Sequence, residues 1–277
     1  MARYIDVHSH LSSYPDVDGV VKRARLAGIE KIISVGVNYK RSKEALQLSK
    51  IYPGIVFPAV GISYGFAGKR KPYETEEHFL QRYKPLDLLL KEVEDIEKLL
   101  KIEGKKIVAI GEIGIDTGIT KEDRYEDQKV IFRKFLELAE QYRKGVMVHS
   151  FSSAGYSNSE RDALEILSCY NIKPIIMHFF QGGKEETKIA IDMGCYFSVA
   201  PRDVSGNLYS SVERVVKQVD IRKLVIESDG PRPKDGVINF DIQPDVLPKI
   251  VENIATIKRK NVEETRCILY ENAEKLF

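Results

Sequence analysis

Eight short runs rich in apolar and β-branched residues recur along the chain, separated mostly by stretches of helical periodicity. The runs cover residues 4–7, 31–37, 55–61, 106–111, 145–149, 174–178, 195–200 and 224–227. Strands that alternate with helices predict a parallel sheet with helical crossovers. Eight repeats in a chain of 277 residues are typical of an α/β fold of the TIM-like (β/α)8 barrel type. A doubly wound open sheet remains the alternative, because periodicity alone does not distinguish the two.

Amphipathic stretches fill most of the gaps between these runs. The clearest covers residues 125–145 and ends at Gly145, after a face formed by Val130, Ile131, Phe135, Leu138 and Ala139. Other helices are predicted at residues 17–28, 42–51, 85–104, 160–170, 184–193, 208–218, 244–258 and 261–274. No linker rich in Pro, Gly or Ser divides them, so we predict one domain over residues 1–277. The long polar connection 63–84 is expected over the face where barrels bind ligands.

Composition argues against several classes of protein. Lys and Arg number 43 and Asp and Glu 41, so the formal net charge of +2 does not predict nucleic-acid binding by bulk charge. No apolar run approaches the roughly 18 residues needed to cross a membrane, and no signal peptide is recognisable. Cys169, Cys195 and Cys267 are scattered, which argues against structural disulfides and favours the cytoplasm. The nucleotide-binding patterns GxGxxG and GxxxxGK[ST] do not occur.

Polar residues at the ends of the apolar runs carry the functional signal. In a barrel, catalytic side chains come from the C-terminal ends of several strands. Four of the five histidines and two acidic residues stand at such ends: His8, His10, Glu112, His149, His178 and Asp229. Imidazole and carboxylate are ligands for Zn, Mn, Fe and Ni ions, and six candidates suffice for two ions bridged by a carboxylate. Two such ions can generate a hydroxide at neutral pH and clamp the oxygens of a phosphoryl or carbonyl centre.

Each of these residues also has a structural explanation when it is taken alone. A histidine at a strand end is usually a half-buried residue with ordinary hydrogen bonds. Glu112 could belong to a turn, and Asp229 could cap a helix, although the sequence Gly-Pro-Arg-Pro that follows it breaks helices. Strand alternation, however, puts His8 and His10 on one side of their strand, where both can face one ion. Metal-type side chains at the ends of five strands therefore favour a metal site.

Five motifs, in this order along the chain, resemble those of a known family. They are DVHSH at 6–10, GEIGID at 111–116, VHS at 148–150, MHFF at 177–180 and ESDGP at 227–231. Together with NAEKLF at 272–277, they resemble the TatD family of the amidohydrolase superfamily. The resemblance implies a TIM-like barrel with one or two divalent ions (Zn, Mg, Mn, Ni or Co). It also implies a metal-dependent hydrolase of ester bonds, most often a deoxyribonuclease that cleaves DNA phosphodiesters.

The resemblance also implies how the site residues are divided between two ions. His8 and His10 would hold one ion, and Glu112 would bridge both. The second ion would be held by His149 and His178. One departure affects none of these residues: TatD proteins commonly carry Gly-x-His-Pro after the third strand, where this chain reads GISY at 61–64. The other lies after the sixth strand, where FFQG at 179–182 replaces a cysteine, a phenylalanine, a small polar residue and glycine.

Asp229 and Glu112 are the expected catalytic residues. By the resemblance, Asp229 would bind the first ion or its water and act as general base on the nucleophile. A metal-bound hydroxide would then attack, and Asp229 would pass the proton to the leaving group. Asp6 and Glu227 lie beside ligands in the sequence. Each is expected either to orient a ligand through a hydrogen bond or to hydrogen-bond a neighbouring strand.

Residues that would touch substrate are less well specified. Arg202, after the seventh strand, and Arg232, after Asp229, are candidates to contact a phosphodiester. Tyr64 is a candidate to stack on the bases of a single strand, as are Phe66, Tyr73 and Phe180. The basic turn at 68–73 could contact phosphate, but its charges are more simply explained as solvated surface.

Two further functions remain open beside DNA hydrolysis. The same ligands can polarise a carbonyl, so a hydrolase of cyclic amides, lactones or small phosphoesters is the first alternative. The second is a non-catalytic metal- or nucleic-acid-binding barrel, although the complete ligand set argues against it. The expected partner is therefore DNA or a small ester or amide, with no membrane and with the oligomeric state undetermined.

Overall fold

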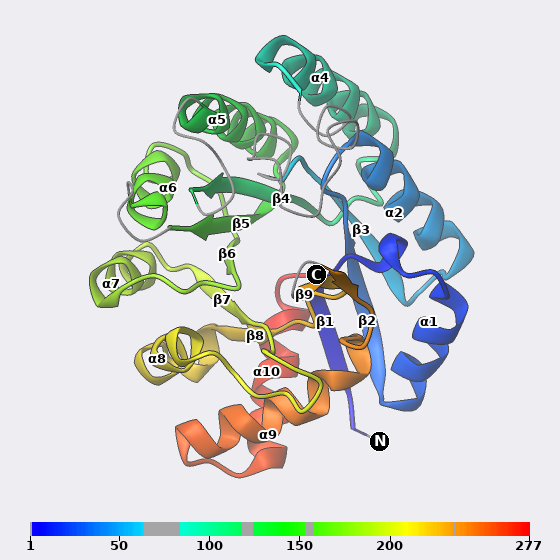
Figure 1. Cartoon of the computed structure of the whole chain (residues 1–277), viewed down its shortest axis with the longest axis vertical. Coiled ribbons are helices and arrows are strands. Elements are labelled where there is room, and N and C mark those ends of the chain that lie inside the picture. The colour runs from blue at the N-terminus through cyan, green and yellow to red at the C-terminus, as the bar shows by residue number, and fades with distance from the viewer. Residues whose placement is uncertain (1, 64–83, 118–123, 153–157, 235–236) are drawn as a thin grey trace.

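The computed structural model describes residues 2–63, 84–117, 124–152, 158–234 and 237–277. Eight parallel strands form one sheet in which each strand pairs with the next along the chain, and helices surround them (Figure 1). This sequential order confirms the predicted TIM-like barrel, because a doubly wound open sheet reverses its strand order part of the way across.

The strands agree with the predicted runs except at their ends. They are β1 Tyr4–Ser9, β2 Ile29–Val35, β3 Val56–Val60, β4 Ala109–Asp116, β5 Gly145–Phe151, β6 Ile175–His178, β7 Tyr196–Val199 and β8 Leu224–Ile226. An antiparallel hairpin of β9 Arg232–Lys234 and β10 Val237–Asn239 follows β8. The largest difference is in β4, which continues past the predicted end at residue 111 to Asp116.

Helices occupy the predicted stretches between the strands. They are α1 Val17–Leu26, α2 Tyr39–Ile51, α4 Leu86–Glu103, α5 Tyr125–Tyr142, α6 Ser159–Leu167, α7 Lys184–Asp192, α8 Ser210–Gln218, α9 Leu247–Lys258 and α10 Val262–Glu274. The predicted stop of α5 at Gly145 is wrong. Arg143 ends this helix in a left-handed conformation (φ 52°), and Gly145 is already the first residue of β5. Val130, expected on the buried face of α5, is 36% exposed, whereas Phe132 is buried.

Two apolar clusters hold the barrel together. The larger lies between strands and helices and includes Phe132 and Phe135 of α5. The smaller includes Ile5, Ile33 and Val225, which come from β1, β2 and β8, and the end of α10 packs onto it through Tyr270, Ala273, Leu276 and Phe277. Because Lys31, near the start of β2, contacts Glu274 of α10 at 2.7 Å, this helix covers the N-terminal end of the strands. The opposite end remains for the strand-end histidines.

The barrel closes between β1 and the segment that follows β8. The backbone N–H of Asp229 donates to the carbonyl of His8 at 2.9 Å, and that of His10 donates to the carbonyl of Gly230 at 2.8 Å. The buried carboxylate of Asp6 accepts from the backbone N–H of Ser228 at 2.9 Å and from its hydroxyl at 2.6 Å. The first and last strands therefore hold the main chain of three candidate ligands in register.

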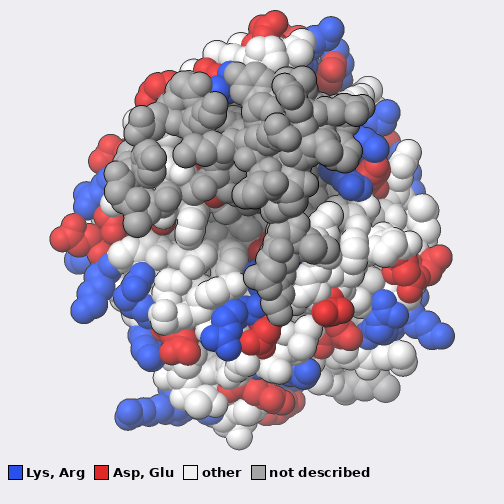
Figure 2. Space-filling model, viewed as in Figure 1, with Lys and Arg blue, Asp and Glu red and all other residues white. Residues whose placement is uncertain are grey.

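Two further observations concern the helices and the surface charge. None of the helices in the described parts of the chain is long and apolar enough to cross a membrane. On the face drawn in Figure 2, Lys and Arg side chains are interspersed with Asp and Glu among the described residues.

The three cysteines are free, as their scattered positions predict.

The Asp6–Ser228 contact should contribute measurably to stability. We expect Ser228→Ala to lower the free energy of unfolding by about 1–3 kcal/mol, because it removes a hydroxyl that donates to a buried carboxyl group. Ser168→Ala, which removes a local hydroxyl contact at the exposed end of α6, should change it by less than about 0.5 kcal/mol. Urea unfolding of both variants tests this, and equal small effects would show that the contact does not stabilise the closed barrel.

Candidate metal centre

The six candidate ligands converge at the C-terminal end of the barrel. His8 lies near the end of β1, Glu112 lies within β4, and His178 is the last residue of β6. The ladder between β5 and β6 places His149 directly beside His178. His10 and Asp229 follow β1 and β8, and the backbone bonds that close the barrel hold them together.

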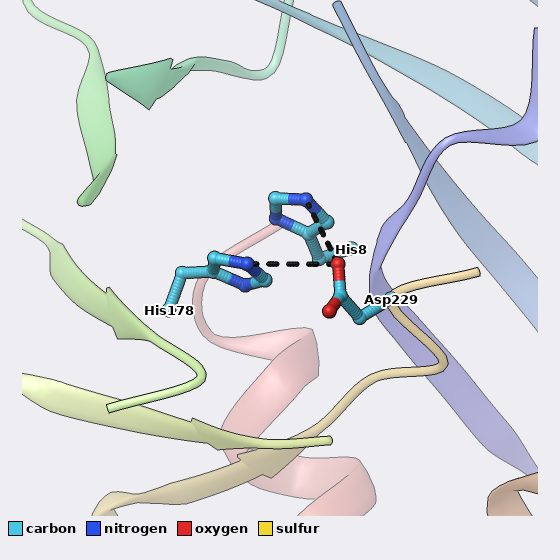
Figure 3. A group of neighbouring side chains, drawn as sticks. All are labelled: His8, His178 and Asp229. Atoms are coloured by element: carbon cyan, nitrogen blue, oxygen red, sulfur yellow. Dashed lines mark ion pairs between the residues drawn. The ribbon is translucent and has the colours of Figure 1, made fainter. Parts of the chain in front are cut away.

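One half of the centre surrounds Asp229. Its Oδ1 atom lies 3.9 Å from Nε2 of His8, 3.5 Å from Nε2 of His10 and 3.6 Å from Nε2 of His178. Figure 3 shows this oxygen directed toward both His8 and His178, with ion-pair contacts to each. The other oxygen, Oδ2, lies 3.3 Å from the Arg232 guanidinium.

Glu112 joins the two halves. Its Oε2 atom lies 3.7 Å from Nε2 of His8 and 3.8 Å from Nε2 of His10, whereas Oε1 lies 3.1 Å from Nδ1 of His149. Donor atoms that bind one ion at about 2.1 Å can lie at most about 4.2 Å apart. All of these contacts fall within that limit, so the two oxygens of Glu112 face two separate sets of possible ligands.

The state of His8 supports the assignment of a metal site. Its ring is 1% exposed and stacks on the ring of His178 at a centroid distance of 3.7 Å. Neither ring nitrogen has a hydrogen-bond partner among the described residues, which is costly for a buried polar group. Burial, together with the neighbouring His178 and His10, holds the pKa of His8 well below its usual value. A neutral imidazole with an available lone pair is the form that binds a divalent ion.

Both carboxylates of the centre are ionised. Burial opposes the charge of Glu112, but the hydrogen bond and charge of His149, with His178 and His8, outweigh it and lower the pKa of Glu112 to about 2. Burial likewise opposes the charge of Asp229, whereas His178, His10 and Arg232 hold its pKa far below the ordinary value. Four imidazoles and two carboxylates are a donor set that fits one or two divalent ions.

A second set of carboxylates lies behind the histidines. Asp116 Oδ2 is hydrogen-bonded to Nε2 of His149 at 2.8 Å, and Glu227 Oε1 lies 3.0 Å from Nδ1 of His178. His149 therefore turns Nδ1 toward the centre and His178 turns Nε2 toward it. A carboxylate behind a histidine ligand fixes its tautomer and raises its basicity. Glu227 thus lies where it can orient a ligand, one of the two roles expected for it.

Asp116 is the residue that sequence reasoning missed. The strand was expected to end at residue 111, whereas β4 reaches Asp116, and the carboxylates of Asp116 and Glu112 contact the two ring nitrogens of His149. Gln128 of α5 fixes the position by accepting from the backbone N–H of Asp116 at 2.8 Å and donating to its carbonyl at 3.0 Å. The GEIGID motif already contained this aspartate, and a longer strand would have drawn attention to it.

Asp6 has the other role that was expected, which is to hydrogen-bond a neighbouring segment of the barrel. Its carboxylate accepts from the backbone N–H of His8 at 3.2 Å and from Ser228, so its contacts join β1 to the segment after β8. Side chains do not alternate regularly between the two faces of β1 from Asp6 to Ser9, because the register with β2 shifts there. Burial raises the pKa of Asp6 to about 7, although the bonds from Ser228 and His8 oppose the rise.

The residues predicted to contact substrate differ in their distance from the centre and in their burial. Arg232 lies against Asp229, and its guanidinium also donates to the carbonyl of Pro201. The side chain of Arg202 is 52% exposed and pairs with Asp203 at 3.2 Å, and its described contacts do not reach the six ligands. Phe180 is buried in the core, so it cannot stack on a substrate. Tyr64, Phe66 and Tyr73 lie outside the described residues.

Removing the Asp116 carboxylate should weaken metal binding. We expect Asp116→Asn to lower the affinity for Zn²⁺ or Co²⁺ by about 10-fold or more, because His149 loses the charge that orients it. Asp95→Asn, at an exposed ion pair on α4, is the matched control and should bind metal like the wild type. Competition against a chromogenic chelator measures both affinities. Unchanged binding by Asp116→Asn would show that Asp116 does not support His149 as a ligand.

Comparisons with known proteins identify the family of this chain. The model of the family described as TatD related DNase matches residues 5–277. The deoxyribonuclease TATDN3 of Homo sapiens is 27% identical over 285 residues, which cover 99% of this chain and 94% of that protein. The uncharacterised metal-dependent hydrolase YabD of Bacillus subtilis is 26% identical over 282 residues, which cover 98% of each chain.

A solved structure shares the fold. The crystal structure of YJJV, a TatD homologue from Escherichia coli, superposes with a TM-score of 0.80 at 22% identity, covering 100% of this chain and 98% of that one. At this identity the likeness shows the fold alone. The family match is independent of it and extends over almost the whole sequence. The chain therefore belongs to the TatD related DNase family and is a metal-dependent hydrolase that acts on ester bonds.

Proposed function

We propose that this hydrolase cleaves phosphodiester bonds of DNA at the centre formed by the six ligands. The observation that carries the proposal is the position of Glu112, because one oxygen faces His8 and His10 and the other faces His149. A carboxylate in that position suits a pair of ions, which can hold both the attacking and the leaving oxygen of a phosphoryl group. The deoxyribonucleases among the relatives support the choice of DNA.

The ligands divide into two sets in this proposal. His8 and His10, with Asp229, would hold one divalent ion, His149 and His178 would hold a second, and Glu112 would contribute to both. Bound there, a divalent ion supplies Lewis-acid polarisation of the ester and lowers the pKa of water from 15.7 toward about 7. The nitrogen-rich donor set favours Zn, Ni, Co or Mn over Mg, because Mg²⁺ prefers oxygen ligands.

Asp229 is the proposed proton acceptor. Its carboxylate is ionised because His178, His10 and Arg232 outweigh the effect of burial on its pKa, so it is available to take a proton from the attacking water. A carboxylate with so low a pKa is a weak base. The attacking water must therefore be acidic enough to lose its proton to so weak a base. Asp229 then passes that proton to the leaving oxygen.

Arg232 is the proposed contact to the phosphate. Its side chain is 15% exposed and lies beside Asp229, so the guanidinium adds a fixed positive charge at the edge of the centre. The described face in Figure 2 mixes both signs of charge. We therefore expect the described residues to hold the scissile phosphate locally, at the ligands and Arg232, rather than along an extended basic groove.

Loss of the proposed base should stop DNA cleavage. We expect Asp229→Asn to reduce cleavage of labelled single- and double-stranded DNA by at least about 100-fold, in metal-free protein restored with Mn, Zn, Co or Mg. Asp192→Asn makes the same change at an exposed ion pair on α7 and should retain wild-type activity. If wild type and Asp229→Asn cleave equally, Asp229 is not the base. If neither cleaves DNA while ions are bound, hydrolysis of cyclic amides, lactones or small phosphoesters becomes the function to test.

Metal should stabilise the protein through Glu112. An ion at 100 times its dissociation constant should raise the free energy of unfolding by about 2.7 kcal/mol, because it binds the folded chain. Glu112→Gln should lose most of this increase, whereas Glu185→Gln, at an exposed position of α7, should keep it. Thermal unfolding with and without chelator measures the difference. An undiminished increase in Glu112→Gln would place the ion elsewhere.

A further inference from the structure

Two adjacent phenylalanines after β6 have opposite environments. Phe180 is 1% exposed and packs in the core against Phe197, at a ring-centroid distance of 5.7 Å. Phe179 is only half-buried, and its backbone is left-handed, with a φ of 43°. A bulky side chain rarely adopts this conformation, so the surrounding structure must hold it there. The turn directs one ring into the core and leaves the other beside the metal centre.

The backbone of Phe179 is tied to the centre. Its N–H donates to Glu227 Oε1 at 3.1 Å and to the hydroxyl of Ser198 at 3.2 Å. The same Glu227 oxygen lies 3.0 Å from Nδ1 of His178. One buried carboxylate therefore positions both a proposed metal ligand and the aromatic residue that follows it.

The ring of Phe179 connects the centre to an exposed aromatic residue. The Arg232 guanidinium lies over the ring at 5.1 Å from its centroid and contacts Asp229 at 3.3 Å. The ring also neighbours Tyr209, whose ring centroid is 5.8 Å away and which is 40% exposed at the start of α8. Tyr209, Phe179, Arg232 and Asp229 thus form a continuous row that leads from solvent to the ligands.

We infer that Phe179 and Tyr209 form a binding subsite for a flat aromatic ring of the substrate, held next to the phosphoryl group that reacts. Aromatic faces bind planar rings by stacking, and stacking on a nucleobase tolerates any base because every base has a flat face. Arg232 is placed to interact with both the phosphate and Phe179. The inference rests on the proposed function, in which that ring is a nucleobase adjoining the scissile phosphodiester.

The experiment compares two ligands that differ only in the base. Deoxyadenosine 5′-monophosphate and deoxyribose 5-phosphate are titrated by calorimetry into the protein loaded with the ion that supports DNA cleavage, or with Zn²⁺ if none does. We expect the nucleotide to bind about 10-fold more tightly or better, within the range that stacking on aromatic side chains supplies. Phe179→Leu and Tyr209→Leu should each lower this ratio toward one, because leucine keeps apolar bulk but has no flat face.

Controls separate a subsite from a general effect. Tyr170→Leu replaces a partly buried tyrosine beyond α6, at the other end of the barrel, and should keep the wild-type ratio. Equal affinity of the wild type for the two ligands, no binding of the nucleotide, or an unchanged ratio in both Leu variants would overturn the subsite. A clear ratio in a protein that does not cleave DNA would refute the proposed function and leave the subsite standing.

Discussion

The buried carboxylate of Glu112 is the group on which the rest of the centre depends. It is 3% exposed, and an ionised carboxylate without partners at such a place costs several kcal/mol. Histidines from β1 and β5 surround it, yet β1 and β4 would lie three strand spacings, roughly 14 Å, apart in a flat sheet. Only a sheet closed on itself brings His8 and His149 to opposite oxygens of one side chain. The site therefore exists only where the barrel is closed.

Carboxylates behind the histidines make metal binding compete with protons. Burial opposes protonation of His149, but Asp116 and Glu112 outweigh it and raise its pKa to about 10. Burial is outweighed in the same way at His178, where the acidic neighbours, Glu227 first among them, raise the pKa to about 9. An ion that binds these nitrogens must displace their protons, so its affinity rises with pH. The same carboxylates then hold the rings in the orientation that the ion needs.

Left-handed backbone positions organise the substrate side of the centre. Asp229, with a φ of 51°, follows β8 and turns its carboxylate toward the histidines, while Phe179, with a φ of 43°, follows β6 and leaves its ring beside Arg232. Aspartate tolerates this conformation better than phenylalanine does. Hydrogen bonds from the backbone N–H of Phe179 to Glu227 and Ser198 hold it in place. Of the four non-glycine residues with positive φ among the described residues, these two lie at the centre, whereas Arg143 and Arg259 end α5 and α9.

The sequence by itself determined the alternation of strands and helices. The sequential pairing of the strands then decided for a barrel over a doubly wound open sheet. The sequence also determined which residues are the candidate ligands, because polar side chains follow the apolar runs. Glu112 nevertheless lies within β4 and not at its end. Only the tertiary structure decided which carboxylate supports which histidine. Asp116 contacts His149 because β4 extends beyond its apolar run, and Asp6 instead hydrogen-bonds the segment that closes the barrel. The tertiary structure also decided that Phe179 and not Phe180 lies beside the centre, and that Arg232 and not Arg202 contacts a candidate ligand. These outcomes depend on register and on backbone dihedrals, which are set by contacts between segments far apart in the chain.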